Sequence, residues 1–183
     1  MEWTLPGTVL QIPQKDGAYV SQVFNALFLG GGIALSQVSG ITGLEPYTVQ
    51  NWVKRGFLPP PEKKRYSLRQ LCRIVNINML KGVLPMERIC SLLTYINGHL
   101  DDVSDDIIDD SELYFMFVKL AMQAPELADA DARERALEST LNTYHEPVPG
   151  AKERVAKVLR IMLTGYLAAK LQQQTEIMIK EIM

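Results

Sequence analysis

The sequence predicts an all-α fold with a small β wing. Apolar residues recur at helical spacing through most of the chain, and Pro, Gly and capping residues punctuate these segments. Only residues 57–66 are expected to form an extended stretch and a short hairpin. With 183 residues, the chain is long enough for one medium domain or two small ones.

The N-terminal part begins with residues 3–14, whose two prolines and one glycine predict an irregular entry segment. A helix is expected over residues 18–29, where apolar residues repeat every three or four positions. The three glycines at 30–32 end this helix. No Gly-Lys-Ser or Gly-Lys-Thr follows them, so the sequence favours a helix stop over a phosphate-binding loop.

Two short helices are expected next, over residues 34–43 and 45–56. Pro46 suits the first position of the second helix, and Gly56 suits a left-handed cap at its end. Trp52 is expected in the core, because it shares an apolar stripe with neighbouring valines.

The segment that follows combines an extended, proline-rich stretch with a basic hairpin, Glu62-Lys63-Lys64-Arg65-Tyr66. Ser67 and Gln70 then match a capping box, which predicts a helix start. Another helix is expected from Pro85 to the Asn97-Gly98 turn.

The second half is expected to be helical at residues 112–123, 125–144 and 151–183. In the last segment, Val155, Leu159, Met162, Tyr166 and Ala169 form an apolar stripe that stops at three glutamines. The stripe is too short to predict a coiled coil. It favours core packing, with a homodimer interface through the C-terminal helices as the alternative.

The charge of the chain is unevenly distributed. The formal net charge is −2, but residues 45–88 hold nine Lys or Arg and only three Asp or Glu. A basic patch inside an acidic chain indicates a local nucleic-acid surface. The alternative is an ordinary solvated face.

The two short helices and the hairpin together suggest a binding module. A helix, a tight turn and a Pro-started helix match a helix-turn-helix, whose second helix can enter the major groove of DNA. The basic hairpin follows at the place where a wing would track the phosphate backbone.

The predicted partner is double-stranded DNA. Gln50 and Asn51 are side-chain types that pair with adenine, although they also suit an ordinary polar helix face. The basic hairpin would neutralise phosphates, and Tyr66 suits either wing packing or a phosphate contact. The predicted DNA-binding residues are Tyr47, Thr48, Gln50, Asn51, Lys54, Arg55, Lys63, Lys64, Arg65 and Tyr66.

These motifs resemble known bacterial families. TVQNWVKRGFL resembles the end of the recognition helix in the MerR-like family, Arg65-Tyr66-Ser67 its wing exit, and LKGVLPMERICSLL its closing helix. NWVKRGFLPPPEKKRYS with LKGVLPMERI is still more similar to the family known as domain of unknown function 1836. The resemblance implies a MerR-like winged helix-turn-helix in a bacterial regulator. Glu45, Tyr47 and Gln50 depart from the residues usual in that family.

We therefore expect a DNA-binding module at residues 18–97, with its core at 34–95, and a helical interaction or dimerisation region at 112–183. The expected function is DNA-binding transcriptional regulation. The alternative is a protein–protein adaptor that uses the same fold without binding DNA. No residue specifies a small-molecule effector, although the eight methionines suit an adaptable pocket.

Other features predict no catalytic or metal site. The acidic run at 101–112 lacks the alternating ligands and glycine of a calcium loop, and is expected to be a solvated turn or a fraying helix start. A sharper hypothesis is that this run folds over the basic patch and weakens DNA binding. His99 and His145 have no catalytic partner at a recognisable spacing, so we expect no enzyme activity, cofactor or metal.

We expect a cytoplasmic protein with no membrane role. Cys72 and Cys90 form no paired motif, which suits a reducing compartment. No signal peptide is recognised. The uncharged stretch at 17–44 is broken by polar residues and glycines, which argues against a membrane span.

Overall fold

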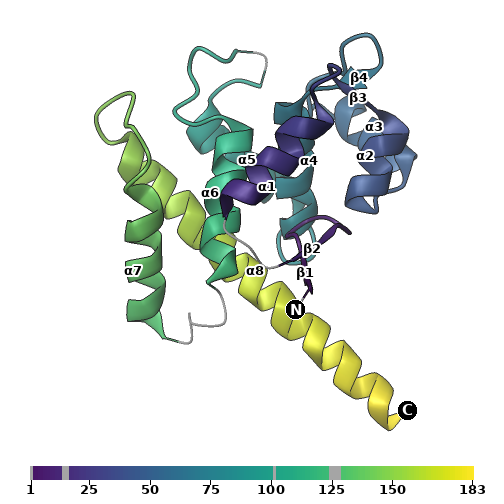
Figure 1. Cartoon of the computed structure of the whole chain (residues 1–183), viewed down its shortest axis with the longest axis vertical. Coiled ribbons are helices and arrows are strands. Elements are labelled where there is room, and N and C mark those ends of the chain that lie inside the picture. Colours follow the sequence, from purple (N-terminus) through teal and green to yellow (C-terminus); the bar gives the residue numbers. More distant parts are fainter. Residues whose placement is uncertain (1, 14–16, 101, 124–128) are drawn as a thin grey trace.

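The computed structural model describes residues 2–13, 17–100, 102–123 and 129–183. Within those residues the protein is mostly helical, with eight helices and two small two-stranded sheets. Helices α2 and α3 lie with one sheet at one end of the molecule, α7 lies at the other end, and α8 runs along the body (Figure 1). The expected predominance of helix is confirmed.

The N-terminal segment was expected to be irregular, and this prediction is wrong. Strand β1 (Glu2–Thr4) pairs antiparallel with β2 (Gln11–Pro13). The turn between them is fixed by a hydrogen bond from the Leu5 amide to the Leu10 carbonyl, and Leu5 is fully buried. Strands of three residues are too short to show a clear alternation of apolar and polar residues in the sequence.

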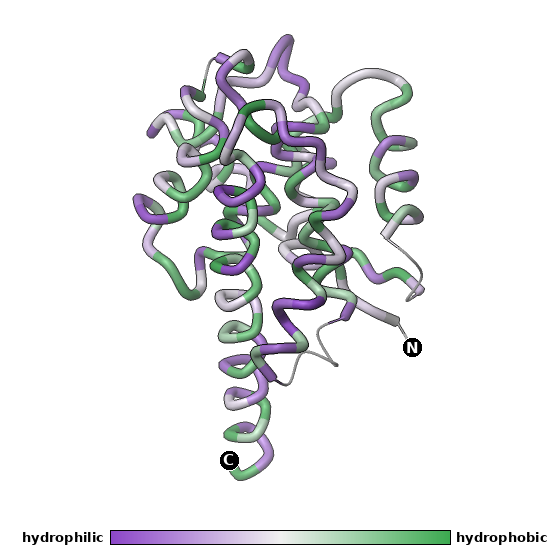
Figure 2. The backbone as a smooth tube through the Cα atoms, turned by 90° about the vertical axis from the view of Figure 1, so that its left-hand side faces the viewer, coloured by the Kyte–Doolittle hydropathy of each residue, from purple (hydrophilic) through white to green (hydrophobic). Residues whose placement is uncertain are grey.

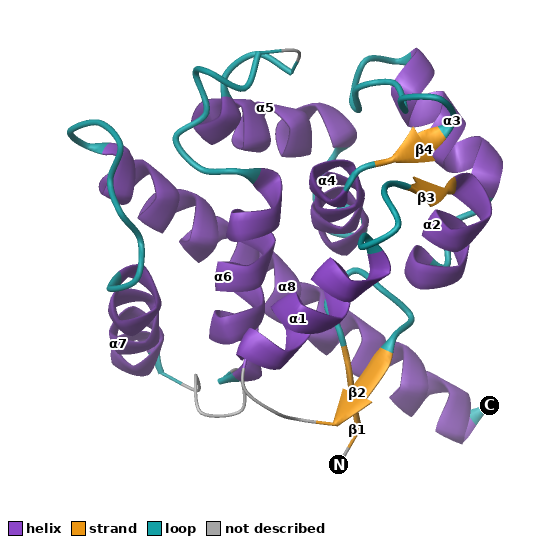
Figure 3. Cartoon of the chain, turned by 45° about the horizontal axis from the view of Figure 1, so that its top comes forward, coloured by secondary structure: helices purple, strands orange, loops and turns teal. Residues whose placement is uncertain are grey.

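Helix α1 (Gly17–Leu27) ends before the three glycines, as expected. Helices α2 (Leu35–Thr42) and α3 (Pro46–Lys54) follow, separated by a tight turn at Gly43, whose φ of 70° favours glycine. Strand β3 (Ile33–Ala34) pairs antiparallel with β4 (Arg65–Tyr66). This sheet lies beside α2 and α3 (Figure 3).

Helix α4 (Leu68–Leu80) is the centre of the fold, and ten of its residues are buried. Its start confirms the predicted capping box, because the Ser67 hydroxyl accepts from the Gln70 amide and the Gln70 side chain accepts from the Ser67 amide. Helices α2, α5, α6 and α8 all pack against α4. This central position connects the N-terminal helices to the rest of the protein.

The remaining helices are α5 (Met86–Asn97), α6 (Asp110–Met122), α7 (Ala130–Leu141) and α8 (Ala151–Ile182). The expected start of a helix at residue 125 lies outside the described residues. The two predicted regions, 18–97 and 112–183, contribute to one hydrophobic core. Among the described helices, none combines the length and the apolar content needed to cross a membrane.

The apolar stripe of α8 packs into this core. Val155, Leu159 and Met162 are fully buried and Tyr166 is 6% exposed, which confirms the predicted core packing. From residue 170 onward the side chains of α8 are exposed, and this part of the helix extends away from the body (Figure 2).

Candidate nucleic-acid interface

Helix α3 has an apolar face and a polar face. Val49 and Trp52 are buried, as predicted for Trp52, while Thr48 is half-buried. The opposite side carries Tyr47, Gln50, Asn51 and Lys54, which we call the α3 face. These residues are spaced by three and four positions, so they share one side of the helix. All four are exposed, and Tyr47 is 70% exposed.

Local sequence explains where α3 begins and ends. Pro46 occupies its first turn, where a missing N–H costs no hydrogen bond, and Glu45 makes no side-chain capping bond. At the other end, Gly56 has a φ of 75° and the Phe57 amide donates to the Trp52 carbonyl. The hydrogen bond gives a carbonyl at the end of the helix a partner, and the left-handed glycine turns the chain toward the hairpin.

The basic hairpin turns at residues 62–65, which we call the hairpin tip. The amide of Arg65 donates to the carbonyl of Glu62 across a distance of 2.8 Å. Lys63 and Lys64 both have positive φ, 47° and 64°, which is the conformation of a two-residue type I′ turn. Both lysines are exposed.

The two residues of β4 lie on opposite sides of the strand. Arg65 is exposed, and its guanidinium donates to the Gly32 carbonyl at 2.7 Å. Tyr66 is only 3% exposed, because successive strand residues alternate sides. The prediction that Tyr66 contacts DNA is therefore corrected: Tyr66 packs into the core and stabilises the hairpin base.

Arg55 connects α3 to α5. Its guanidinium lies 3.2 Å from a carboxylate oxygen of Glu87 and 4.5 Å from the centre of the Phe57 ring. These contacts fix the direction of a side chain that is still about half exposed. Sequence reasoning missed Glu87, because it is 32 residues away from Arg55 and no local spacing marks the pair.

Two other arginines of the basic region pair with acidic residues, and their side chains are only 23% (Arg69) and 5% (Arg73) exposed. Arg69 pairs with Asp106 at 2.7 Å, and Arg73 pairs with Asp110 at 3.4 Å. Asp109 caps α6 through the Ser111 amide. The acidic run was expected to be solvated, and this prediction is wrong for Asp110, which is 1% exposed. Asp101 lies outside the described residues.

Electrostatics in this cluster follow from burial. Burial raises the pKa of Asp106 to about 6, although the Arg69 guanidinium opposes this shift. Asp106, Asp109 and Asp110 pair with Arg69 or Arg73 on α4. Among the described residues, none of these three carboxylates forms an ion pair with the α3 face or the hairpin tip. The acidic run therefore covers part of the basic region predicted from the sequence, at α4.

His99 contacts a carboxylate at an exposed turn, and Cys72 lies in the protein core. The sequence offers no catalytic partner for His99 at a recognisable spacing, and in the structure its Nδ1 lies 3.0 Å from a carboxylate oxygen of Asp105, at an exposed turn. Cys72 is buried, and burial raises the pKa of its thiol well above the usual value. In the described part of the chain, no cluster of three His, Cys, Asp or Glu could hold a metal ion.

The structure thus brings together the α3 face and the hairpin tip at one end of the molecule (Figure 3). Residues 45–66 contain five basic and two acidic residues, a net charge of +3 in a chain whose net charge is −2. This arrangement presents polar hydrogen-bonding groups on a helix and positive charges on an adjacent hairpin.

Comparisons with known proteins identify the family. A family model described as "Domain of unknown function (DUF1836)" matches residues 8–117, from the loop before β2 into α6. The chain is also similar to "Uncharacterized protein YkrK" from Bacillus subtilis (strain 168), with 25% identity over 122 residues. The alignment covers 62% of this chain and 52% of YkrK, so the chain spans about half the length of that relative. No solved structure matches.

The family match includes α3, the hairpin tip and the acidic residues that pair with Arg69 and Arg73. It covers more than half of the 183 residues. The chain therefore belongs to the DUF1836 family.

Proposed function

We propose that this protein is a cytoplasmic bacterial transcriptional regulator that binds duplex DNA. In this proposal α2 and α3 form a MerR-like helix-turn-helix, and the hairpin tip is its wing. Two short helices around a tight turn, with an exposed polar face on the second helix, suit insertion of α3 into the major groove.

The observation that carries the proposal is the conformation of Lys63 and Lys64. Both residues have positive φ, where Asn and Gly are the favoured residues of a type I′ turn. A non-glycine residue in this region costs roughly 1 kcal/mol. Strained residues cluster at functional sites, so two strained, exposed lysines support a role for their charges.

The proposed roles follow from chemistry and exposure. Gln50 and Asn51 can pair with base edges, preferably adenine, in the major groove. Lys54, Lys63, Lys64 and Arg65 can neutralise phosphates, which positions the protein without reading sequence. Arg55 would approach a phosphate in the direction set by Glu87 and Phe57.

The test is fluorescence anisotropy with a labelled duplex of random sequence at several salt concentrations. A variant carrying K63N and K64G retains the turn preference and removes two charges. When the logarithm of the binding constant is plotted against the logarithm of the salt concentration, we expect the slope of the variant to be less steep by about 1.8. Each neutralised phosphate contributes about 0.9 to this slope. The control is K152Q with K180Q, which removes two exposed charges from α8. Equal slopes for all three proteins would overturn the proposed wing.

Tyr47 favours a second candidate function, a protein–protein adaptor. It is 70% exposed in the α3 face, and aromatic residues are enriched at protein interfaces. The same titration separates the two functions, because the adaptor would show no duplex binding at low salt. A Y47A variant would then lose association with a partner protein.

The proposed regulator would act as a homodimer through the exposed end of α8. The apolar stripe in the first part of α8 packs into the core. Beyond it, Leu171, Met178 and Ile182 are 64%, 65% and 85% exposed. Helix-turn-helix proteins commonly dimerise to bind paired half-sites. Sedimentation equilibrium of the wild type and an L171E/M178E variant tests this point, and a monomeric wild type would contradict it.

A further inference from the structure

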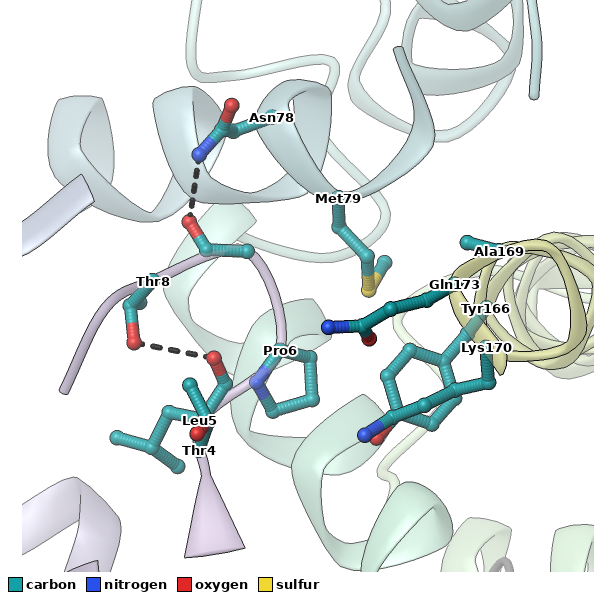
Figure 4. A pocket seen from close by; sticks show the side chains of 11 residues that line it. Thr4, Leu5, Pro6, Thr8, Asn78, Met79, Tyr166, Ala169, Lys170 and Gln173 are labelled. Carbon is teal, nitrogen blue, oxygen red and sulfur yellow. Dashed lines mark hydrogen bonds between the residues drawn. The ribbon is translucent and has the colours of Figure 1, made fainter. Parts of the chain in front are cut away.

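A pocket lies where three segments that are distant in the sequence meet. It is bounded by the end of β1 and the loop that follows it (residues 4–8), the end of α4 and the part of α8 that leaves the body (Figure 4). Its volume is about 350 Å³. Small-molecule sites in proteins usually occupy about 300–1,000 Å³, so this pocket can hold a small ligand.

Part of the pocket lining, contributed by α4 and α8, is apolar. Tyr166 and Met79 are 6% and 7% exposed, and the Met79 thioether projects toward the space between α4 and the loop (Figure 4). Trp3 hydrogen-bonds to Tyr166, and burial raises the pKa of this phenol, so it stays neutral. An aromatic ring beside a polarisable thioether suits a flat or short apolar ligand body.

The α8 wall of the pocket, which holds Tyr166, also carries one positive charge. Of the described residues that line the pocket, only Lys170 is charged, and its Nζ lies 5.6 Å from the centre of the Tyr166 ring. Gln173 extends from the next turn of α8 toward the loop (Figure 4). Among the described residues, Lys170 forms no ion pair and the side-chain amide of Gln173 makes no hydrogen bond. No carboxylate from the described part of the chain lines the pocket.

From this arrangement we propose that the pocket binds a small organic carboxylate. The apolar body lies against Met79 and Tyr166, and the carboxylate accepts hydrogen bonds from the Lys170 ammonium and the Gln173 amide. Charge-assisted hydrogen bonds of this kind are stronger than neutral ones, so the ammonium provides most of the preference for an anion.

The pocket wall is connected to α2. The Asn78 amide donates to the carbonyls of Gly7 and Thr42, at 2.9 and 3.0 Å, and the Val9 amide donates to the Ile41 carbonyl. A ligand that shifts the loop at Gly7 would therefore change the end of α2. This regulatory consequence rests on the proposed DNA-binding function, whereas carboxylate binding does not.

The experiment uses benzoate as the probe and benzamide as its neutral counterpart, with the full chain and no DNA. Methionine methyl groups are labelled with ¹³C, the Met79 signal is assigned with an M79L variant, and Met178 on the exposed end of α8 is the internal reference. We expect benzoate to shift the Met79 signal saturably, and benzamide to bind at least tenfold more weakly.

A K170M variant keeps the apolar stem of the side chain and removes its charge. We expect it to raise the dissociation constant for benzoate at least tenfold, whereas K180M, on the same helix outside the pocket, leaves it unchanged. No saturable Met79 shift at 20 mM benzoate, or equal affinities of the wild type and K170M, would overturn the site. Because no DNA is present, a failure of the proposed function would not change this result.

Discussion

Arg73 and Asp110 form a buried ion pair that joins α4 to α6. Arg73 Nη1 lies 3.4 Å from Asp110 Oδ2, and their side chains are only 5% and 1% exposed. Arg73 also donates from Nε to the Phe57 carbonyl, so the same guanidinium binds the segment that follows α3. The pair therefore connects the candidate interface to the C-terminal helices.

Removing one partner of this pair should be strongly destabilising. We expect R73M to lower the free energy of unfolding by roughly 3 kcal/mol, because the buried Asp110 carboxylate loses its main counter-charge. The measurement is urea unfolding at pH 7. A double variant, R73M with D110L, should recover a large part of this loss. An R73M variant as stable as the wild type would contradict the structural role of the pair.

Asp106 should make stability depend on pH. Its pKa in the folded protein is about 6, above its ordinary value of 3.8, because burial outweighs the attraction of Arg69. The folded state therefore binds this proton more tightly than the unfolded state does. The resulting contribution to the free energy of unfolding is fully present below about pH 4 and is lost as the pH rises through about 6.

The D106N variant isolates this effect from the other carboxylates, including Asp110 and Glu112, whose pKa values burial also raises. We expect the thermal midpoint of the wild type to fall relative to that of D106N between pH 4 and pH 7. A difference that is constant over this range would show that Asp106 does not titrate there.

The hairpin tip should gain stability when its lysines are replaced by residues that favour positive φ. We expect K63N with K64G to raise the free energy of unfolding by roughly 1 kcal/mol, because Asn and Gly relieve the strain at both positions. K63A with K64A removes the same charges without this relief. Thermal unfolding of both variants compares the two effects, and equal stabilities would argue against the turn described here.

Gln70 should stabilise the segment that leads into the hairpin. Its side-chain amide donates to the carbonyls of Pro59 and Pro60, at 3.1 and 2.9 Å, and its oxygen accepts from the Ser67 amide. We expect Q70M to cost about 2 kcal/mol in urea unfolding, because buried hydrogen-bonding groups lose their partners. S67A, which removes only the cap, should cost about 1 kcal/mol. A Q70M variant that costs less than S67A would contradict this assignment.

Local sequence signals predicted much of the fold. The capping box at Ser67, the glycines at 43 and 56, and the buried position of Trp52 all depend on residues close in sequence, and the structure confirms them. The pairing of β1 with β2 was missed, because each strand has only three residues.

Contacts between residues that are distant in the sequence could not be predicted from local patterns. The contacts of Arg69 and Arg73 with the acidic run depend on how α6 packs on α4, and no spacing in the chain predicts them. For the same reason the basic region looked larger in the sequence than it is on the surface. The pocket at Tyr166 joins three distant segments and gave no signal of its own.

Whether α3 recognises a DNA sequence is tested most directly by capture and sequencing of bacterial genomic DNA fragments with the purified protein, beside a Q50A/N51A variant. Both residues are exposed on the α3 face, so the variant should fold normally. We expect the wild type to enrich a shared sequence motif, and the variant to lose this motif while retaining salt-dependent binding. If the wild type enriches no fragments even at low salt, α3 is not a DNA-recognition helix and the proposed function is wrong.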